Sequence, residues 1–181
     1  IQLDPGFQII FDKDNTLQID AKWESICKLF ESIEKGSSDK LNKFMKEAEF
    51  KYDFGINKLV YEPGLSLLEL AKPEIFSNVF KLQMFTSYRK HVADHFSNPY
   101  LKSLLEFPVL FLGTAPSQTP ALYSLMTYSG IKQGTYYPMG GFGKVIDAFA
   151  DICKEKGVSF HTNENIEKIN VNNNIAESLS T

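Results

Sequence analysis

The chain has very little arginine, because Arg89 is the sole arginine among 19 basic residues in 181. Arginine is the side chain that most often reads phosphates and base edges through paired hydrogen bonds. The basic residues are mixed with 22 acidic ones, and the formal charge of -3 leaves no concentrated positive field. Nucleic acid is therefore not expected as a partner.

Cysteine and long apolar runs are also scarce. Cys27 and Cys153 lie far apart among apolar residues, which indicates buried free thiols in a reducing compartment. No basic and apolar leader opens the chain, and no run approaches the roughly 20 apolar residues that a membrane span needs. A cytoplasmic, non-spanning protein is expected. The chain begins without methionine and stops after a predicted strand, so we expect a processed or excised fragment.

Apolar residues are plentiful, at 43% of the chain, and 13% of the residues are aromatic. A chain of this length and composition can bury a sizeable core. We therefore expect residues 1–181 to form a single domain.

Alternating apolar residues predict strands at both ends of the chain. Aromatic and β-branched residues flank an Asp/Asn cluster at 12–15, which favours a β-hairpin. An Asn turn at 172–174 separates two further predicted strands. The predicted strands cover residues 7–11, 16–19, 158–161, 166–171 and 175–179.

Between these strands the spacing of apolar residues changes to three and four, which is typical of amphipathic helices. The predicted helices cover residues 22–33, about 37–55, three or four short segments within 59–107, about 120–128, and 144–156. We therefore predict an α+β fold, with a mixed β-sheet built from strands at both ends and a helical insert over about 22–130.

The stretch 75–90 is rich in large apolar residues and is bordered by basic residues at 72, 81, 89 and 90. One interpretation is core or domain packing. The other is a membrane face, lying in the plane of the bilayer, through which a lipid-dissolved substrate enters.

A glycine cluster at 140–143 precedes the last predicted helix, which is the order of a dinucleotide site. Read from Gly141, the pattern places Ile146 where a glycine or alanine is needed, so the fingerprint fails. A phosphate-binding P-loop fails as well, because Pro138 and Val145 occupy its first glycine and its hydroxyl position.

His91 and His95 have metal-ligand spacing on a predicted helix, but the glutamate of a zinc protease helix is absent between them. The remaining histidine, His161, lies far along the chain, so surface or partly buried histidines and no metal are expected. Ser117 and Ser124 lack a nucleophile elbow. The motif search thus finds no catalytic constellation.

Three segments, in order, resemble motifs of the bacterial-type phytoene desaturase family of flavoprotein oxidoreductases. The first is a Gly-x-x-Pro segment leading into Pro-Ala-Leu-Tyr, the second is an aromatic-Tyr-Pro-x-Gly-Gly signature, and the third is a Gly-Val strand pair. They occupy residues 113–125, 136–141 and 156–169.

This resemblance implies the substrate domain of a two-domain FAD-dependent oxidoreductase that introduces double bonds into a carotenoid-type polyene. The Gly-x-Gly-x-x-Gly unit and the Gly-Asp segment that close around FAD in the family are absent from this sequence. The isolated chain is therefore expected to be inactive and to bind FAD weakly. Phe142 stands where many members carry a smaller residue.

The resemblance also implies site residues. Gly140 and Gly141 are expected at the junction with the flavin domain, over about 136–143, and Ile166 lies in a second junction segment, 158–181. The apolar polyene slot is expected to be lined by Phe111, Leu112, Leu122, Leu125, Met126, Tyr136 and Tyr137. No catalytic base is assigned.

Other functions stay open at this level. A related flavoprotein could isomerise, saturate or oxidise a polyene or another apolar substrate. A non-catalytic lipid-binding or protein-interaction module is the remaining alternative.

Overall fold

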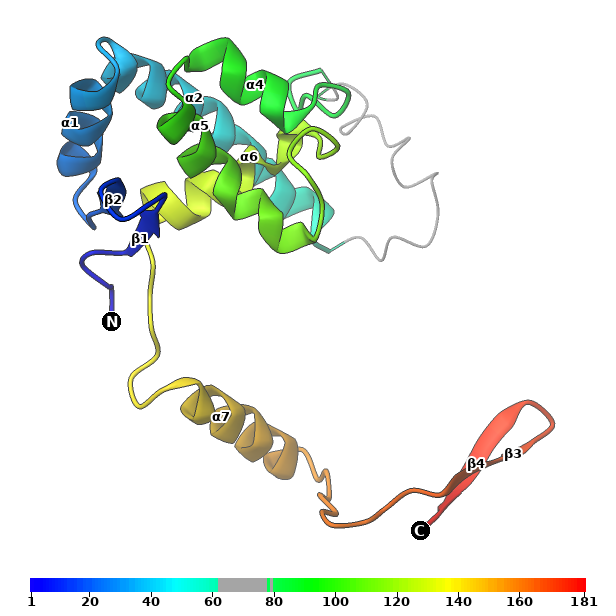
Figure 1. Ribbon diagram of the computed structural model, residues 1–181. Coiled ribbons are helices and arrows are strands. Elements are labelled where there is room, and N and C mark those ends of the chain that lie inside the picture. The colour runs from blue at the N-terminus through cyan, green and yellow to red at the C-terminus, as the bar shows by residue number, and fades with distance from the viewer. Residues whose placement is uncertain (62–77, 79) are drawn as a thin grey trace. The chain divides into compact units, whose positions relative to one another are not determined.

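The computed structural model describes residues 1–61, 78 and 80–181 (Figure 1). The chain divides into two compact units, Ile1–Tyr137 and Pro138–Thr181. The boundary falls within the segment 136–143, whose role as the junction with a flavin domain stays a prediction.

The first unit consists of a β-hairpin followed by helices. Its elements are β1 (Phe7–Ile10), β2 (Thr16–Ile19), α1 (Trp23–Ile33), α2 (Ser37–Phe54), the π-helical η1 (Gly55–Leu59), α4 (Tyr88–His95), α5 (Pro99–Glu106), the 3-10 helices η3 (Phe107–Leu112) and η4 (Ala121–Tyr123), α6 (Ser124–Thr127), and the π-helical η5 (Tyr128–Gln133).

The predicted N-terminal hairpin is confirmed. β1 and β2 pair antiparallel, with Phe7 opposite Ile19. The Asp12 carboxylate accepts hydrogen bonds from the backbone N–H groups of Asp14 and Asn15, at 2.9 and 3.0 Å. These bonds lower the pKa of Asp12, and the bond from Asp14 has the largest effect. The aspartate therefore satisfies backbone donors that the turn leaves without a ladder partner.

The predicted helices over 22–33 and 37–55 are also confirmed, as α1 and α2. Their apolar stripes face a common core, because side chains at three- and four-residue spacing share one face of a helix. The fully buried apolar side chains of this core include Ile26, Phe30, Leu41, Phe44, Tyr88, Val92, Phe96, Leu101, Leu104 and Leu105.

Glu34 joins the end of α1 to the start of α5. One carboxylate oxygen accepts from Lys40 Nζ at 2.7 Å, and the other accepts from the N–H groups of Ser97 and Asn98 at 2.9 and 2.8 Å. The Asn98 side chain then caps α5 by accepting from the N–H of Tyr100 at 2.9 Å. A single acid thus holds together segments more than 60 residues apart in sequence.

Lys51 is a fully buried cation in the last turn of α2. Its Nζ donates to Gln83 Oε1 at 2.7 Å, to Ala121 O at 3.0 Å and to Ser124 Oγ at 3.0 Å. All three ammonium hydrogens therefore have acceptors. Gln83 has a positive φ of 53°, which is uncommon for a residue other than glycine. Lys51 links α2 to this turn and to η4 and α6.

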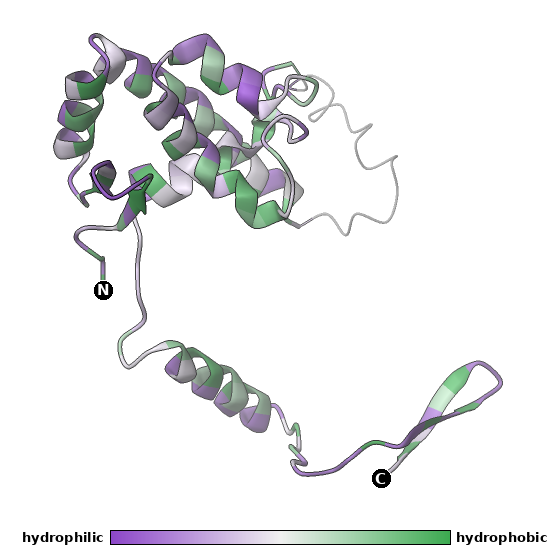
Figure 2. Ribbon diagram, in the orientation of Figure 1, coloured by the Kyte–Doolittle hydropathy of each residue, from purple (hydrophilic) through white to green (hydrophobic). Residues whose placement is uncertain are grey.

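The second unit contains α7 (Phe142–Glu155), β3 (Lys168–Asn172) and β4 (Ile175–Ser180). The predicted helix over 144–156 is confirmed, and Figure 2 shows its apolar residues along one side. β3 and β4 pair antiparallel with an irregularity between Asn170 and Val171. Asn173 and Asn174 both have positive φ, which suits the tight turn between these strands.

The α+β class, with strands at both ends and helices between, is confirmed. The four strands do not form one mixed sheet in the described residues: β1 with β2 and β3 with β4 make two separate antiparallel pairs. Each pair is closed by its own short turn, so pairing these neighbouring strands costs little loop-closure entropy. The predicted strand over 158–161 is wrong, because it has no ladder partner in the described chain.

Replacing Lys51 by methionine tests the link that this side chain makes. Lys51→Met keeps the apolar stem but leaves three buried acceptors without a donor, so we expect a loss of about 2–4 kcal/mol of unfolding free energy. Chemical denaturation followed by circular dichroism measures the change. Lys43→Met, at an exposed position of the same helix, is the control and should change stability by less than about 0.5 kcal/mol. Equal stability of the two variants would contradict the structural role of Lys51.

Candidate functional site

The glycine turn predicted at the domain junction lies at the N-terminus of α7. The N–H of Gly141 donates to Pro138 O at 3.0 Å, and Gly140 and Gly141 have φ values of 79° and 86°. Gly141 has ψ 172°, a combination that is essentially restricted to glycine. A Cβ at position 140 would lie 2.9 Å from Lys144 Cγ. The backbone itself therefore requires both glycines.

Ile166 lies just before β3 and is 45% exposed. The neighbouring N–H of Glu167 donates to Ser180 O at 2.9 Å, so the hairpin ladder starts immediately after Ile166. The contact of this segment with FAD stays a prediction.

The predicted slot residues of the first unit fall into two groups. Leu122, Leu125 and Met126 are half-buried in η4 and α6, which pack against α2. Leu125 Cδ2 lies 3.4 Å from the position that a Cβ at Gly55 would take. Phe111 and Leu112 end the exposed η3 helix, which also packs against α6. The structure therefore places these five residues on neighbouring elements.

Tyr136 and Tyr137 lie apart from that group, along the N-terminal segment of the chain. Tyr136 forms a β-bridge with Gln2. The N–H of Tyr137 donates to Ile1 O at 2.9 Å, and the terminal amino group donates to Tyr137 O at 2.7 Å. Both tyrosine side chains are substantially exposed, and their contact with substrate stays a prediction.

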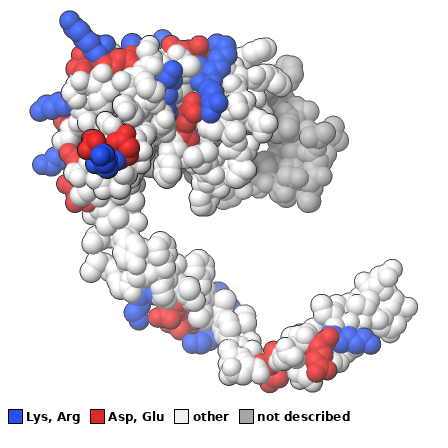
Figure 3. Space-filling model, in the orientation of Figure 1, with Lys and Arg blue, Asp and Glu red and all other residues white. Residues whose placement is uncertain are grey.

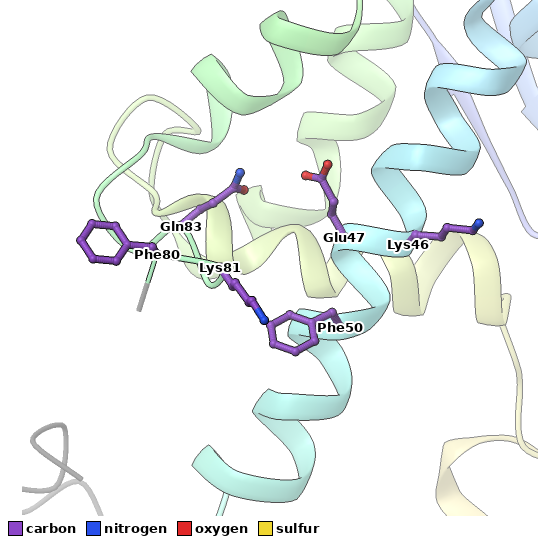
Figure 4. Close-up of a pocket in the computed structure, with 6 residues that line it drawn as sticks. All are labelled: Lys46, Glu47, Phe50, Phe80, Lys81 and Gln83. Atoms are coloured by element: carbon purple, nitrogen blue, oxygen red, sulfur yellow. The ribbon is translucent and has the colours of Figure 1, made fainter. Parts of the chain in front are cut away.

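Sequence reasoning missed a pocket of about 410 Å³ beside α2. Figure 4 shows Glu47 and Gln83 extending toward the same space, while Lys81 extends toward Phe50. The Lys81 ammonium lies 5.8 Å from the centroid of the Phe50 ring. The spacing of Lys46, Glu47 and Phe50 on one helix could have marked this face. The other lining residues, however, come from the segment that leads into α4, about 30 residues further along the chain. The lining residues are Lys46, Glu47, Phe50, Phe80, Lys81 and Gln83.

Behind this pocket lies a cluster of titratable groups. The His91 ring is buried, stacks on Phe44 with centroids 5.0 Å apart, and has its Nε2 3.8 Å from Glu47 Oε2. His95 Nδ1 lies 2.9 Å from His91 O, and its Nε2 lies 4.0 Å from Glu47 Oε1. His91 is thus more deeply buried than the sequence indicates, because α4 packs against α2. The described residues contain no group of three or more His, Cys, Asp or Glu arranged to hold a metal.

Burial lowers the pKa of His91 to about 3, and the nearby charge of Lys51 acts in the same direction. Asp94 opposes this shift more weakly. His91 is therefore a neutral imidazole in the folded protein at neutral pH, and it forms part of the core beside the pocket rather than a proton carrier.

The model of the flavin containing amine oxidoreductase family matches residues 8–179 of the chain. The match extends over both units. The chain belongs to this family.

Several curated relatives cover almost the whole chain. It is 29% identical over 169 residues to a carotenoid 3,4-desaturase of Haloarcula japonica, covering 93% of the chain and 34% of that protein. It is 23% identical over 172 residues to a phytoene desaturase of Fusarium fujikuroi, covering 94% of the chain and 30% of the relative. It is 22% identical over 169 residues to a zeta-carotene-forming phytoene desaturase of Myxococcus xanthus, covering 93% of the chain and 33% of that protein.

The chain spans about a third of the length of these relatives. Membership of the flavin-containing family confirms the resemblance that the motifs indicated and the class of cofactor that it implied. The described residues fit that cofactor at one place. Gly140 and Gly141 have no side chain, and Gly141 provides no side-chain cap to α7, so a ring system or a phosphate could approach the backbone there.

Acid denaturation tests the burial of His91. Its pKa is lowered from an ordinary 6.5 to about 3 on folding, so the unfolded chain binds more protons between these values, and stability falls as pH falls. In His91→Phe, which preserves stacking on Phe44, we expect this slope to decrease by up to about 1.4 kcal/mol per pH unit. Urea midpoints measured between about pH 6.5 and pH 4 give the slope.

His161→Phe, which removes an exposed histidine of the second unit, provides the control variant. Identical slopes for the wild type and His91→Phe would show that His91 is not buried as a neutral group.

Proposed function

We propose that the complete protein that contains this chain is an FAD-dependent carotenoid desaturase, and that this chain supplies much of its substrate-binding side. The observation that carries the proposal is the match of about 93% of the chain to proteins curated as carotenoid and phytoene desaturases. The match to the flavin-containing family supports a flavin-dependent oxidation.

Desaturation removes two hydrogens from neighbouring carbons, and FAD supplies the electron acceptor that no side chain can replace. The protein must hold a long apolar molecule against the flavin and exclude water. A polyene offers only apolar surface and π-faces, so aliphatic and aromatic side chains suit its binding. We assign this role to Phe111, Leu112, Leu122, Leu125, Met126, Tyr136 and Tyr137.

We assign Gly140 and Gly141 to the flavin side of the site. Their positive φ values hold a turn without side chains at the start of a 14-residue helix, whose N-terminus carries partial positive charge. Ile166 is assigned to the adenine end of FAD through its backbone. Neither assignment requires a side chain to act in the reaction.

A membrane contact through about 75–90 is a further part of the proposal, for a protein located in the cytoplasm. Residues 75–77 and 79 lie outside the described chain. Phe80 and Phe85 are 84% and 86% exposed, whereas Leu82 is fully buried in the first unit. The buried Leu82 supports core packing for one part of the stretch. The exposed Phe80 and Phe85 support a surface contact for another part.

Two glycines of the same segment provide a matched test of the flavin assignment. Gly141→Ala forces a side chain into a glycine-only conformation at a cost of about 1–3 kcal/mol, so we expect flavin binding by the complete protein to weaken by about tenfold or more. Gly143→Ala lies inside α7 with nothing within 4 Å of the added Cβ, and it should retain flavin. The flavin content of each purified protein is read from its visible absorbance.

The 181-residue chain alone should not purify with stoichiometric flavin, since most pyrophosphate contacts of this family lie elsewhere. A yellow isolated chain, or equal flavin content in both glycine variants, would contradict the assignment of the turn.

The products formed by the complete protein distinguish a desaturase from an isomerase and from a saturase. Expressed with a phytoene-type polyene, a desaturase should yield pigments that have lost two hydrogens per step and absorb at longer wavelength. An isomerase would leave the mass unchanged, and a saturase would increase it. Mass spectrometry and absorption spectra of the extracted pigments supply the measurement.

In the same assay Met126→Ala and Tyr137→Ala should change the product pattern, whereas Lys43→Ala should not. An unchanged pattern in both slot variants would rule out the proposed lining.

A further inference from the structure

The pocket beside α2 has an apolar part and a polar part. Phe50 and Phe80 supply aromatic faces, and the Lys81 ammonium lies 5.8 Å from the centroid of the Phe50 ring. Glu47 and Gln83 extend toward the same space from α2 and from the segment before α4 (Figure 4). At about 410 Å³ the pocket is large enough for a small organic molecule.

The Glu47 carboxylate has unused capacity to accept hydrogen bonds. In the described chain no donor lies within hydrogen-bond distance of it, and the basic atoms beside it are His91 Nε2 at 3.8 Å and His95 Nε2 at 4.0 Å. Both separations exceed the length of a hydrogen bond. A carboxylate at the edge of a pocket that accepts nothing from its own chain can accept from a bound molecule.

Lys51 fixes the orientation of the Gln83 amide. Lys51 Nζ donates to Gln83 Oε1 at 2.7 Å, and an ammonium can only donate, so the acceptor end of the amide must face it. The NH2 group is the end that remains, and no described residue accepts from it. The polar part of the pocket therefore offers an acceptor on Glu47 and a donor on Gln83.

The imidazole behind Glu47 is also unpaired at one nitrogen. His91 Nε2 is buried and has no hydrogen-bond partner in the part of the chain that the structure describes. Buried polar atoms of native proteins nearly always have partners. Glu47, Gln83 and His91 thus keep more polar capacity at this end of the pocket than their own contacts use, and the neutral His91 adds no charge there.

The charges around the pocket disfavour an ionised ligand. An anion would meet the Glu47 carboxylate. A cation would meet the Lys81 ammonium on one side and the Lys51 ammonium behind Gln83. Figure 3 shows Lys and Arg side chains interspersed with Asp and Glu on the visible face of the first unit, so no field of one sign draws in a charged molecule there. The pocket therefore suits a neutral molecule.

We propose that this pocket binds a neutral apolar molecule through a hydroxyl group, which donates to Glu47 and accepts from Gln83. A single hydroxyl can do both at once. Phe50 and Phe80 contact the apolar body of the ligand. None of these residues belongs to the proposed polyene slot, and the inference goes beyond the proposed function because it involves neither flavin nor desaturation.

Lys51 joins this pocket to elements of the proposed slot. The ammonium that orients Gln83 also donates to Ala121 O and Ser124 Oγ, in η4 and α6. A ligand held by Gln83 would add to the contacts that hold these elements together. Because it binds the folded state, it should raise the thermal unfolding midpoint as its concentration rises.

Calorimetric titration of the complete protein with geraniol, an uncharged isoprenoid alcohol, tests the site. Geranyl acetate keeps the apolar chain but cannot donate a hydrogen bond, and geranate carries a negative charge. We expect each of these two to bind at least about tenfold more weakly than geraniol. Equal affinity for geraniol and geranyl acetate would overturn the hydroxyl contact.

Two variants each remove one hydrogen-bonding partner. Glu47→Met removes the acceptor, and Gln83→Glu replaces the NH2 donor by an oxygen while another oxygen still accepts from Lys51. Each should weaken geraniol binding by about tenfold or more. Lys46→Met is the control, because Lys46 extends away from the other lining residues in Figure 4, and it should retain binding.

Met126→Ala separates this pocket from the proposed slot and should leave the affinity for geraniol unchanged. Binding lost in Met126→Ala and retained in Glu47→Met and Gln83→Glu would place geraniol in the slot and overturn the inference. Urea midpoints show whether Gln83→Glu keeps the stability of the wild type; if it does not, Glu47→Met and the three ligands decide the outcome. A protein that forms no desaturated pigment but binds geraniol with these preferences would contradict only the proposed function.

Discussion

The burial of the Lys51 ammonium is the constraint on which the rest of the first unit depends. A buried charge without partners would be expelled or neutralised. Burial lowers the pKa of this lysine to about 8, against the weaker opposing effect of the Glu47 charge. Three acceptors from two distant parts of the chain therefore gather around it. This arrangement fixes the end of α2 against η4 and α6, the elements that hold Leu122, Leu125 and Met126. These three residues of the proposed slot thus lie on elements that the Lys51 hydrogen bonds hold in place.

The second unit depends on a different constraint, which is backbone conformation. Gly140 and Gly141 turn the chain with φ values that other residues rarely adopt, and α7 begins directly after them. In a flavin-containing family such a turn suits a place where main chain must pass close to a ring system. The first unit is thus held by side-chain contacts, and the start of the second unit is set by backbone conformation.

Apolar residues gather in one uncharged part of the first unit. The uncharged run from Phe107 to Ile131 contains η3 at one end and the half-buried residues of η4 and α6 next to it. One continuous stretch of sequence therefore supplies both exposed and half-buried apolar side chains.

Local patterns were sufficient for much of the fold. The alternation of apolar residues predicted both hairpins, and their recurrence every three or four residues predicted α1, α2 and α7. Each of these elements is stabilised by contacts between residues near in sequence. The glycine turn and the family could also be predicted, since positive φ values and short motifs depend on a few adjacent residues. The turns at Asp12 and Asn173 could be predicted for the same reason.

Pairing and burial were decided only by the tertiary structure. The predicted strand over 158–161 is extended chain without a partner, because a strand exists only where another chain segment supplies its hydrogen bonds. Lys51, His91 and Glu47 look like ordinary helix-surface residues in the sequence. The burial of Lys51 and His91, and the pocket beside Phe50 that Glu47 lines, result from α2 packing against segments about 30 to 70 residues away. Sequence periodicity carries no information over such a distance.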